Sequence, residues 1–210
     1  MPGATVFPGG KVDASDGTAE DTPEHRFGLA LIRELREEAN LHVAADALVP
    51  FANWLTPTAE PRRFDTWFFA VRAPDGQEPM HDRHETTEVG WHRPQDAIDA
   101  HQSGGPILLP PPTLHTLQRL VAIGGDVAQL LATLAAGGLG PQIMPHFMAD
   151  SPDGPTIVLP WDPLHPDAPA VVATHGVALL AMAGVVLQAG PLPRIDRFVL
   201  REGRFGRVSR

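Results

Sequence analysis

Three glutamates on one short predicted helix constrain this chain more than any other feature of its sequence. In the stretch LIRELREEANLHV, residues 31–43, Glu34, Glu37 and Glu38 stand at spacings of i, i+3 and i+4. A helix places these side chains within an arc of about 100° on one face. Like charges at this spacing destabilise an isolated helix by roughly 0.2–0.5 kcal/mol per pair, unless a cation lies among them.

A carboxylate cluster of this kind suits a hard divalent ion. Carboxylate oxygens are good ligands for Mg²⁺ and Mn²⁺, which share their coordination with waters and substrate phosphates. Arg33 precedes Glu37 by one helical turn, and we predict that it holds that carboxylate in a ligating rotamer. The residues alone leave an alternative open, which is an ordinary solvated Glu/Arg helix face.

The flanks of the cluster predict where its helix begins and ends. Thr22 is a candidate N-cap, Pro23 suits the first helical position, and Glu24 lies in the first turn. At the other end, Asn40 is predicted to stop the helix in the left-handed conformation that Gly usually adopts there. We therefore predict a helix over residues 22–40.

Composition narrows the class of partner. The chain has 16 basic and 25 acidic side chains and a formal net charge of −9, which argues against nucleic acid or an anionic membrane as partner. Cysteine is absent, which excludes a disulfide framework and a thiolate nucleophile and suits the reducing cytoplasm. The apolar stretch 176–190 is too short to span a bilayer comfortably, so we predict a buried helix or strand pair. We expect a cytoplasmic protein that acts on a small molecule.

The rest of the sequence predicts an α/β fold followed by a Pro-rich extension. A soft boundary near Gly138 separates a domain at residues 1–137 from an α+β extension at residues 138–210. The predicted strands are residues 3–8, 48–54, 64–71 and 88–92, the predicted helices are 94–102, 113–125 and 126–136, and a hairpin turns at Glu202 and Gly203.

A PGG turn at residues 8–10, a loop and the acidic helix follow one another in an order that resembles the Nudix hydrolase family. The box of that family is written G-x5-E-x7-R-E-U-x-E-E-x-G-U, where U is aliphatic. Residues 33–41 fill its second half, and Gly10 stands at its head. The position eight before Arg33 holds His25 instead of Glu, the loop after Gly10 is longer than the box allows, and Asn40 replaces the usual Gly. We expect the missing Glu to remove one accessory ligand or helix-packing contact.

A second stretch narrows the resemblance to one branch of the family. NWLTPTAEPRRFDTWFFA at residues 53–70, with VFPGGKVD and LLPPPTLHTL, is similar to Nudix enzymes related to peroxisomal coenzyme A diphosphatases. The resemblance implies an α/β/α sandwich around a mixed sheet, with Mg²⁺ or Mn²⁺ as cofactor. Family sheets normally include strand material before the box, so we expect that material to be truncated here. The extension after Gly138 would then complete the sheet, form a homodimer interface, or cover the substrate.

The resemblance and the residue chemistry together predict a site. Glu34, Glu37 and Glu38 are the predicted metal ligands, and the predicted catalytic residues are Glu37, Arg33 and Glu85. Glu85 is favoured over Glu88 as the loop carboxylate that assists the base, and a solvated loop is the alternative. The predicted substrate-binding residues are Gly9, Gly10, Arg62, Arg63 and Asp65.

The two arginines of that set are predicted to contact phosphate, because a guanidinium pairs bidentately with phosphate oxygens. Ion pairs with Asp65 or Glu60 are the alternative. The whole pattern predicts metal-dependent hydrolysis of a diphosphate linkage in a nucleoside diphosphate linked to another moiety, such as coenzyme A or acyl-CoA. Two alternatives stay open: a non-catalytic Nudix-fold nucleotide-binding or regulatory module, and an inactive fragment of a longer hydrolase.

Overall fold

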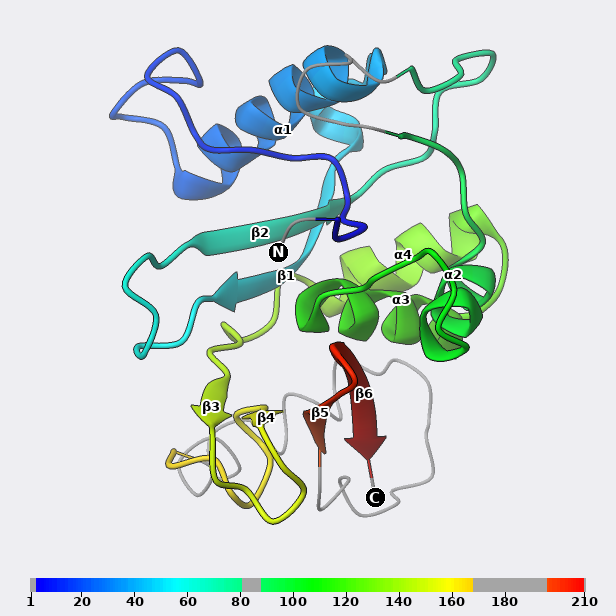
Figure 1. The fold of residues 1–210 in the computed structure, drawn as a ribbon. Helices are drawn as coiled ribbons and strands as arrows, with labels where there is room; N and C mark the ends of the chain where they lie inside the picture. The colour runs from blue at the N-terminus through cyan, green and yellow to red at the C-terminus, as the bar shows by residue number, and fades with distance from the viewer. Residues whose placement is uncertain (1–2, 81–87, 168–195, 210) are drawn as a thin grey trace.

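Figure 1 shows a computed structural model of the chain, which describes residues 3–80, 88–167 and 196–209. The predicted apolar segment 176–190 and the predicted base Glu85 lie outside the described residues. The elements, in chain order, are α1 (Pro23–Ala39), the short 3₁₀ helix η1 (Ala45–Ala47), β1 (Val49–Leu55), β2 (Asp65–Ala70), α2 (Pro94–Gln102), α3 (Pro111–Ile123), α4 (Val127–Gly137), β3 (His146–Met148), β4 (Thr156–Val158), β5 (Asp196–Arg201) and β6 (Arg204–Ser209).

The hairpin of β1 and β2 separates two groups of helices (Figure 1). On one face of the hairpin, Trp67 of β2 stacks on Phe27 of α1, with ring centroids 5.2 Å apart. On the other face, Trp54 of β1 meets His115 of α3 edge-on, with ring centroids 5.4 Å apart. This alternation follows from the strand period of two, which sends successive side chains to opposite faces. The predicted α/β class is confirmed.

Among the described residues, the strands do not show the mixed sheet that the resemblance implies. In the described residues they form two antiparallel sheets, β1-β2 and β3-β4-β5-β6. One parallel bridge joins Trp54 to Ile143, through backbone bonds from Leu55 N to Ile143 O (2.9 Å) and from Ile143 N to Asn53 O (2.8 Å). Pro141 and Pro145 flank the bridge, and since proline has no N–H, the pairing is not continued into a strand.

Most of the predicted elements are confirmed, and two strands are wrong. Helix α2 has the predicted bounds, and α3 begins two residues early because Pro111 is tolerated in the first turn. Residues 3–8 and 88–92 are not strands. Within the described part of the chain, the first segment makes one backbone bond to a distant residue, from Thr5 N to Leu108 O at 2.8 Å. An extended segment becomes a strand only beside a partner edge, and such an edge cannot be seen in the segment's own sequence.

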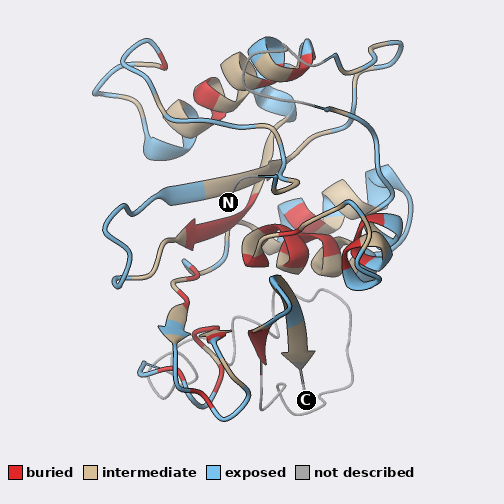
Figure 2. Cartoon of the chain, viewed as in Figure 1, coloured by how far each residue is buried: buried red, intermediate tan, exposed pale blue. Residues whose placement is uncertain are grey.

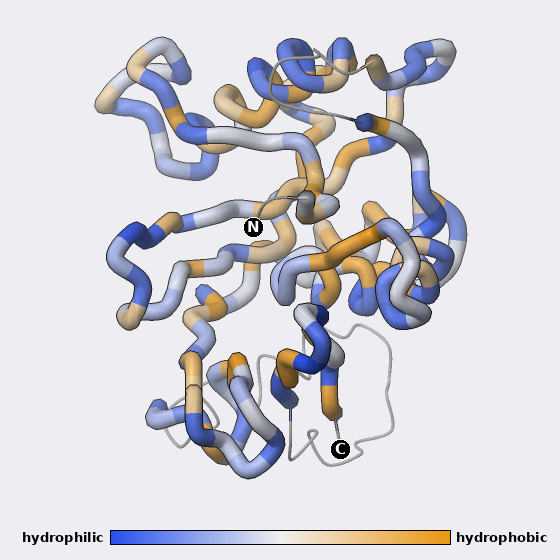
Figure 3. The backbone as a smooth tube through the Cα atoms, in the orientation of Figure 1, coloured by the Kyte–Doolittle hydropathy of each residue, from blue (hydrophilic) through white to orange (hydrophobic). Residues whose placement is uncertain are grey.

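The main core draws residues from both sides of Gly138. It comprises Phe51, Ala52, Trp54, Ala97, Ile98, Leu109, Leu114, Leu117, Leu134, Ile143, Leu159 and Phe198. Figure 2 shows buried residues concentrated in β1, α2, α3 and β5, and Figure 3 shows apolar residues in α3 and β5. The described part of the extension therefore packs on the same core as the helices, and the boundary near Gly138 stays a prediction. Among the described residues no single helix is long and apolar enough to cross a membrane; α3 and α4 reach that length only as a pair bent by 112°.

Candidate active site

Helix α1 is held at both ends as its sequence predicts. The Thr22 side chain accepts a hydrogen bond from His25 N at 3.2 Å, and Pro23 occupies the first turn. Asn40 has φ 52° and ψ 33°, and its N–H bonds to Arg36 O, so it fills the left-handed cap position that was predicted. Leu35 and Ala39 are buried in a small cluster with Leu41. The opposite face of α1 is left to the charged side chains.

The PGG turn lies directly against this charged face. Glu38 Oε2 accepts a hydrogen bond from Gly9 N at 3.0 Å. A Cβ added to Gly10 would lie 2.0 Å from Glu34 Oε1 and 2.3 Å from its Cδ. Only a residue without a side chain fits at position 10 while Glu34 keeps this rotamer. The structure thus brings two predicted substrate-binding glycines onto two of the three predicted metal ligands.

Arg33 lies among the carboxylates and is mostly buried, with 17% of its side chain exposed. Its Nη1 donates to Glu34 Oε1 at 2.8 Å and, more weakly, to Glu37 Oε2 at 3.3 Å. Its Nη2 donates to the carbonyl of Lys11 at 2.8 Å. The predicted contact of Arg33 with Glu37 is present, and the contact with Glu34 is the shorter one. One guanidinium therefore orients two carboxylates and fastens the loop that follows the PGG turn.

Asp16 is the residue that the sequence analysis missed. Arg33 donates two hydrogen bonds to the Asp16 carboxylate, from Nε at 3.1 Å and from Nη2 at 2.9 Å. The hydrogen bond from Arg33 is the largest cause that lowers the pKa of Asp16, and the same bond raises the pKa of Arg33. Burial opposes both shifts. The pair is therefore doubly ionised throughout the physiological pH range.

A signal for Asp16 was present in the spacing. Counted forward from Gly10, the sequence reads G-x5-D, so Asp16 stands at the position of the box Glu. Counting backward from Arg33 leads instead to His25, whose ring nitrogen Nδ1 lies 2.9 Å from Asp21 Oδ1. The first half of the box is thus present with Asp in place of Glu, and the extra residues lie between Asp16 and Arg33. The sequence analysis expected the box carboxylate to be missing, and Asp16 supplies one.

The donor set on α1 suits a divalent ion by chemistry, while its geometry in the structure is not yet that of a closed site. Glu34 is largely buried, and 54% of the Glu37 side chain is exposed. Among the described residues, no group of three His, Cys, Asp or Glu side chains converges around one point. The carboxylate of Glu34 is turned toward the Arg33 cation, and that of Glu38 toward the Gly9 amide. Rotation of Glu37 and Glu38 about their side-chain bonds would be needed to bring three carboxylates together.

The predicted phosphate contacts of the β1–β2 loop are not joined to the cluster on α1. Arg63 donates from Nε to the carbonyl of Thr56 at 2.9 Å and so closes its own loop. Asp65 accepts hydrogen bonds from the side chains of Asn53 and Gln142. Arg62 is exposed, and no partner for its guanidinium is present in the part of the chain that is described. Arg62 is therefore the better placed of the two arginines to reach a ligand.

Comparison with known proteins relates the carboxylate helix and the residues after it to a known domain family. Residues 26–120 match the model of the NUDT19 Nudix domain, and this range includes α1 from residue 26 onward, with Arg33 and all three glutamates. Over this range the chain is similar to the Nudix family. The PGG turn and Asp16 precede the matched range, and the structure joins them to the Nudix domain through the contacts described above.

Two curated relatives agree with this assignment. A Caenorhabditis elegans protein named "Putative nudix hydrolase 7" is 29% identical over 157 residues, which cover 57% of this chain and 51% of the relative. A Xenopus laevis protein named "Acyl-coenzyme A diphosphatase NUDT19" is 28% identical over 166 residues, which cover 75% of this chain and 42% of the relative. The chain spans about half the length of the curated relatives it matches. No solved structure matches the chain.

Proposed function

We propose that the chain hydrolyses a diphosphate linkage in a nucleoside diphosphate joined to a second moiety, with Mg²⁺ or Mn²⁺ bound on α1. The observation that supports this most directly is the contact of the PGG turn with α1. Gly10 lies against Glu34, Gly9 binds Glu38, and Arg33 orients Glu34 and Glu37. Helical spacing puts the carboxylates on one face, and the hydrogen bonds from Gly9 and Arg33 offset part of their mutual repulsion.

Each residue has a role in this proposal. Glu34, Glu37 and Glu38 would hold the ion, which supplies charge neutralisation of the diphosphate and lowers the pKa of a nearby water. Arg33 fixes the carboxylate orientation, and Asp16 fixes Arg33. A carboxylate then takes a proton from the attacking water, and Glu37 or Glu85 would serve as that base. Arg62 would contact a phosphate oxygen of the substrate.

For the substrate we favour coenzyme A or an acyl derivative, since the Xenopus laevis relative is named an acyl-coenzyme A diphosphatase. The products from coenzyme A would be adenosine 3′,5′-bisphosphate and 4′-phosphopantetheine. We further propose that the hairpin is part of the α/β/α sandwich of the family. The helices on both faces of β1-β2 and the parallel bridge at Ile143 support that architecture.

The test is product analysis after incubation with Mg²⁺ and coenzyme A, ADP-ribose or NADH, each in a separate reaction. The parent chain should cleave the diphosphate of at least one substrate into two separate phosphate esters, and Glu37→Gln should reduce that rate by about 100-fold or more. The matched control is Glu24→Gln, which removes an exposed carboxylate from the same helix at a distance from the cluster. A parent chain that cleaves none of the three, or a Glu37→Gln variant as active as the parent, rejects the proposal.

The second candidate is a nucleotide-binding module without catalysis. It is favoured by one observation, that among the described residues no three carboxylates converge on one point. In that case a nucleotide would raise the melting temperature of the chain without being turned over. The same product analysis, run with a thermal melt, separates the two candidates.

A further inference from the structure

The segment between Asp16 and Arg33 is longer than the Nudix box allows. Residues 17–32 separate the two side chains, where the box motif has seven residues. The ion pair of Asp16 with Arg33 nevertheless closes across this segment, with N–O distances of 2.9 and 3.1 Å. The additional residues therefore form a loop beside the site and leave the ion pair of Asp16 with Arg33 intact. They also supply the first turns of α1.

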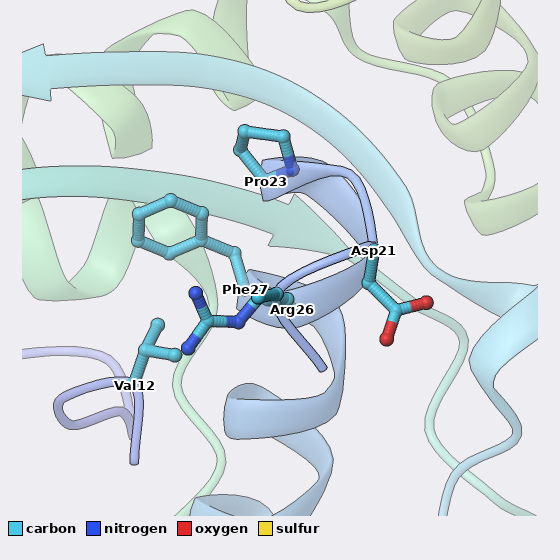
Figure 4. A pocket seen from close by; sticks show the side chains of 6 residues that line it. Val12, Asp21, Pro23, Arg26 and Phe27 are labelled. Carbon is cyan, nitrogen blue, oxygen red and sulfur yellow. The ribbon is translucent and has the colours of Figure 1, made fainter. Parts of the chain in front are cut away.

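These looped-out residues build a cavity of about 470 Å³ at the N-terminal end of α1. Its lining is formed by Val12, Ala19, Asp21, Pro23, Arg26 and Phe27, and all but Val12 come from the inserted segment. Figure 4 shows the ring of Phe27 and the guanidinium of Arg26 side by side, with Pro23 and Val12 around them. The volume lies within the range of about 300–1,000 Å³ that small-molecule sites occupy.

The walls of the cavity are suited to a flat, uncharged ring. Phe27 is backed by Trp67, with ring planes only 10° apart, so its ring is held in a fixed orientation. Arg26 is anchored by a hydrogen bond from Nε to the carbonyl of Asp16 at 3.4 Å. An aromatic ring and a guanidinium plane are the two side-chain surfaces on which nucleobases stack.

The charges around the cavity argue against a phosphate as its occupant. The stretch of chain that lines it, residues 12–27, carries Asp13, Asp16, Glu20, Asp21 and Glu24. Asp21 is ionised, since hydrogen bonds from the backbone and side chain of Thr18 lower its pKa. In Figure 4 the Asp21 carboxylate points away from the ring of Phe27. An uncharged base avoids this repulsion, while a phosphate dianion does not.

We propose that this cavity binds the nucleobase of the substrate. The inference rests on the proposed diphosphate chemistry only for its orientation, with the phosphates at the carboxylates and the base toward the N-terminus of α1. Arg26 precedes Arg33 by two helical turns, about 10.5 Å along the helix axis. The inserted segment is then the part of the chain that selects nucleotide diphosphates from other diphosphates.

The experiment compares two probes that differ only in the base. Adenosine monophosphate and ribose 5-phosphate are titrated into the full chain by isothermal calorimetry in the presence of Mg²⁺. The parent should bind adenosine monophosphate about fivefold or more tightly than ribose 5-phosphate, because stacking of one base contributes at least that factor. Equal binding of the two probes, or undetectable binding of adenosine monophosphate, overturns the proposal.

Two variants and two matched controls test whether the nucleobase binds in the cavity. Ala19→Trp fills the cavity from an exposed position, and Ala14→Trp places the same ring on the same loop outside the lining. Arg26→Ala removes the guanidinium wall, and Arg36→Ala removes an exposed arginine from the same helix. Ala19→Trp should weaken adenosine monophosphate at least fivefold and Arg26→Ala about threefold, with ribose 5-phosphate unchanged and both controls equal to the parent. Parental affinity in Ala19→Trp would contradict the proposal.

The outcomes distinguish this inference from the proposed function. Base-dependent binding that Ala19→Trp abolishes, in a chain that cleaves no diphosphate, retains the cavity and rejects the hydrolase. Diphosphate cleavage that is unaffected by Ala19→Trp, with equal binding of the two probes, retains the hydrolase and rejects the cavity.

Discussion

Two regions of this molecule contain networks of arginine and carboxylate side chains, and the two networks differ in how far solvent reaches them. On α1, Arg33 binds Asp16, Glu34 and Glu37, and more than half of the Glu37 side chain remains exposed. In the second sheet, Arg197 makes two 3.0 Å bonds to Asp162, whose side chain is 0% exposed. Beside it, Arg207 binds both oxygens of the buried Asp196 at 2.6 and 2.7 Å.

The difference shows which network is available for chemistry. The carboxylates of β5 and its neighbours are saturated: Asp162 also accepts the backbone N–H of Asp196, and Asp196 also accepts the indole N–H of Trp161. Those groups hold the extension together and have no oxygen to offer a ligand. On α1 there are more carboxylates than cations, and the excess faces solvent. A divalent-cation site requires solvent-accessible carboxylates held on a rigid backbone element, and α1 provides both.

Removal of a buried partner should have the largest effect on stability. Asp162→Asn leaves Arg197 buried without its countercharge, so the free energy of unfolding should fall by about 3–5 kcal/mol in urea titrations. Asp150→Asn, at an exposed position in the same extension, should change it by less than about 0.5 kcal/mol. A loss below about 1 kcal/mol in Asp162→Asn would show that the two networks do not differ as described.

Acid should weaken the packing between α3 and the second region in a defined pH window, through His115. Burial, together with the neighbouring Arg207 cation, lowers the pKa of His115 to about 3. Because the unfolded chain takes up this proton near pH 6.5 and the folded chain does not, stability is full above that pH and falls below it. Between pH 6 and pH 4 the loss should be roughly 2.5 kcal/mol for this residue. Burial also lowers the pKa of His165, which adds a loss of the same sign.

His115→Phe tests this window, because Phe retains a ring between Trp54 and Trp161. Urea unfolding of the variant at pH 6 and pH 4 should show a smaller difference than in the parent. If the two proteins depend on pH equally, His115 is not the group responsible.

Loss of Asp16 should affect the site and stability together. Asp16→Ala leaves Arg33 without its bidentate partner, and the expected cost is about 1–3 kcal/mol in urea unfolding. The turnover of a diphosphate substrate should fall as well, because Arg33 then no longer holds Glu34 and Glu37 in place. Asp16→Glu restores the residue of the family box and should recover much of both properties. An Asp16→Glu variant as impaired as Asp16→Ala would contradict the positioning role.

A methyl group at position 10 should separate activity from stability. In Gly10→Ala the new Cβ displaces Glu34, so turnover should fall at least tenfold. The displaced atoms are the end of a side chain, so the free energy of unfolding should differ from that of the parent by less than about 1 kcal/mol. Gly206→Ala, where a Cβ meets nothing within 4 Å, is the matched control. Parental turnover in Gly10→Ala would show that Glu34 needs no fixed rotamer.

Local sequence signals predicted the parts of the fold that depend on neighbours along the chain. Thr22 and Asn40 marked the ends of α1, and Glu202 and Gly203 marked a hairpin turn whose residues both have positive φ. These features depend on caps and backbone sterics, which act over a few residues. The strands predicted at 3–8 and 88–92 failed because pairing needs a distant edge.

The candidate site was predictable to a similar extent. The cluster on α1 followed from helical spacing alone. The role of Asp16 did not, because an insertion separates it from its partner in sequence while the fold closes the pair. Arg63 shows the converse limit: a guanidinium that could bind phosphate instead bonds to the carbonyl of Thr56 in its own loop. Residue type gives the chemistry that is possible, and only the fold gives the partner that is used.

The most direct test of the account is Mn²⁺ binding, followed by electron paramagnetic resonance of the free ion. The parent should bind Mn²⁺ at α1, and Glu37→Gln should lower the affinity by about tenfold or more. Glu24→Gln should match the parent, and all three proteins should have equal unfolding free energies within about 0.5 kcal/mol. Equal Mn²⁺ affinity in the parent and in Glu37→Gln would contradict the central claim that the exposed carboxylates of α1 form the cation site.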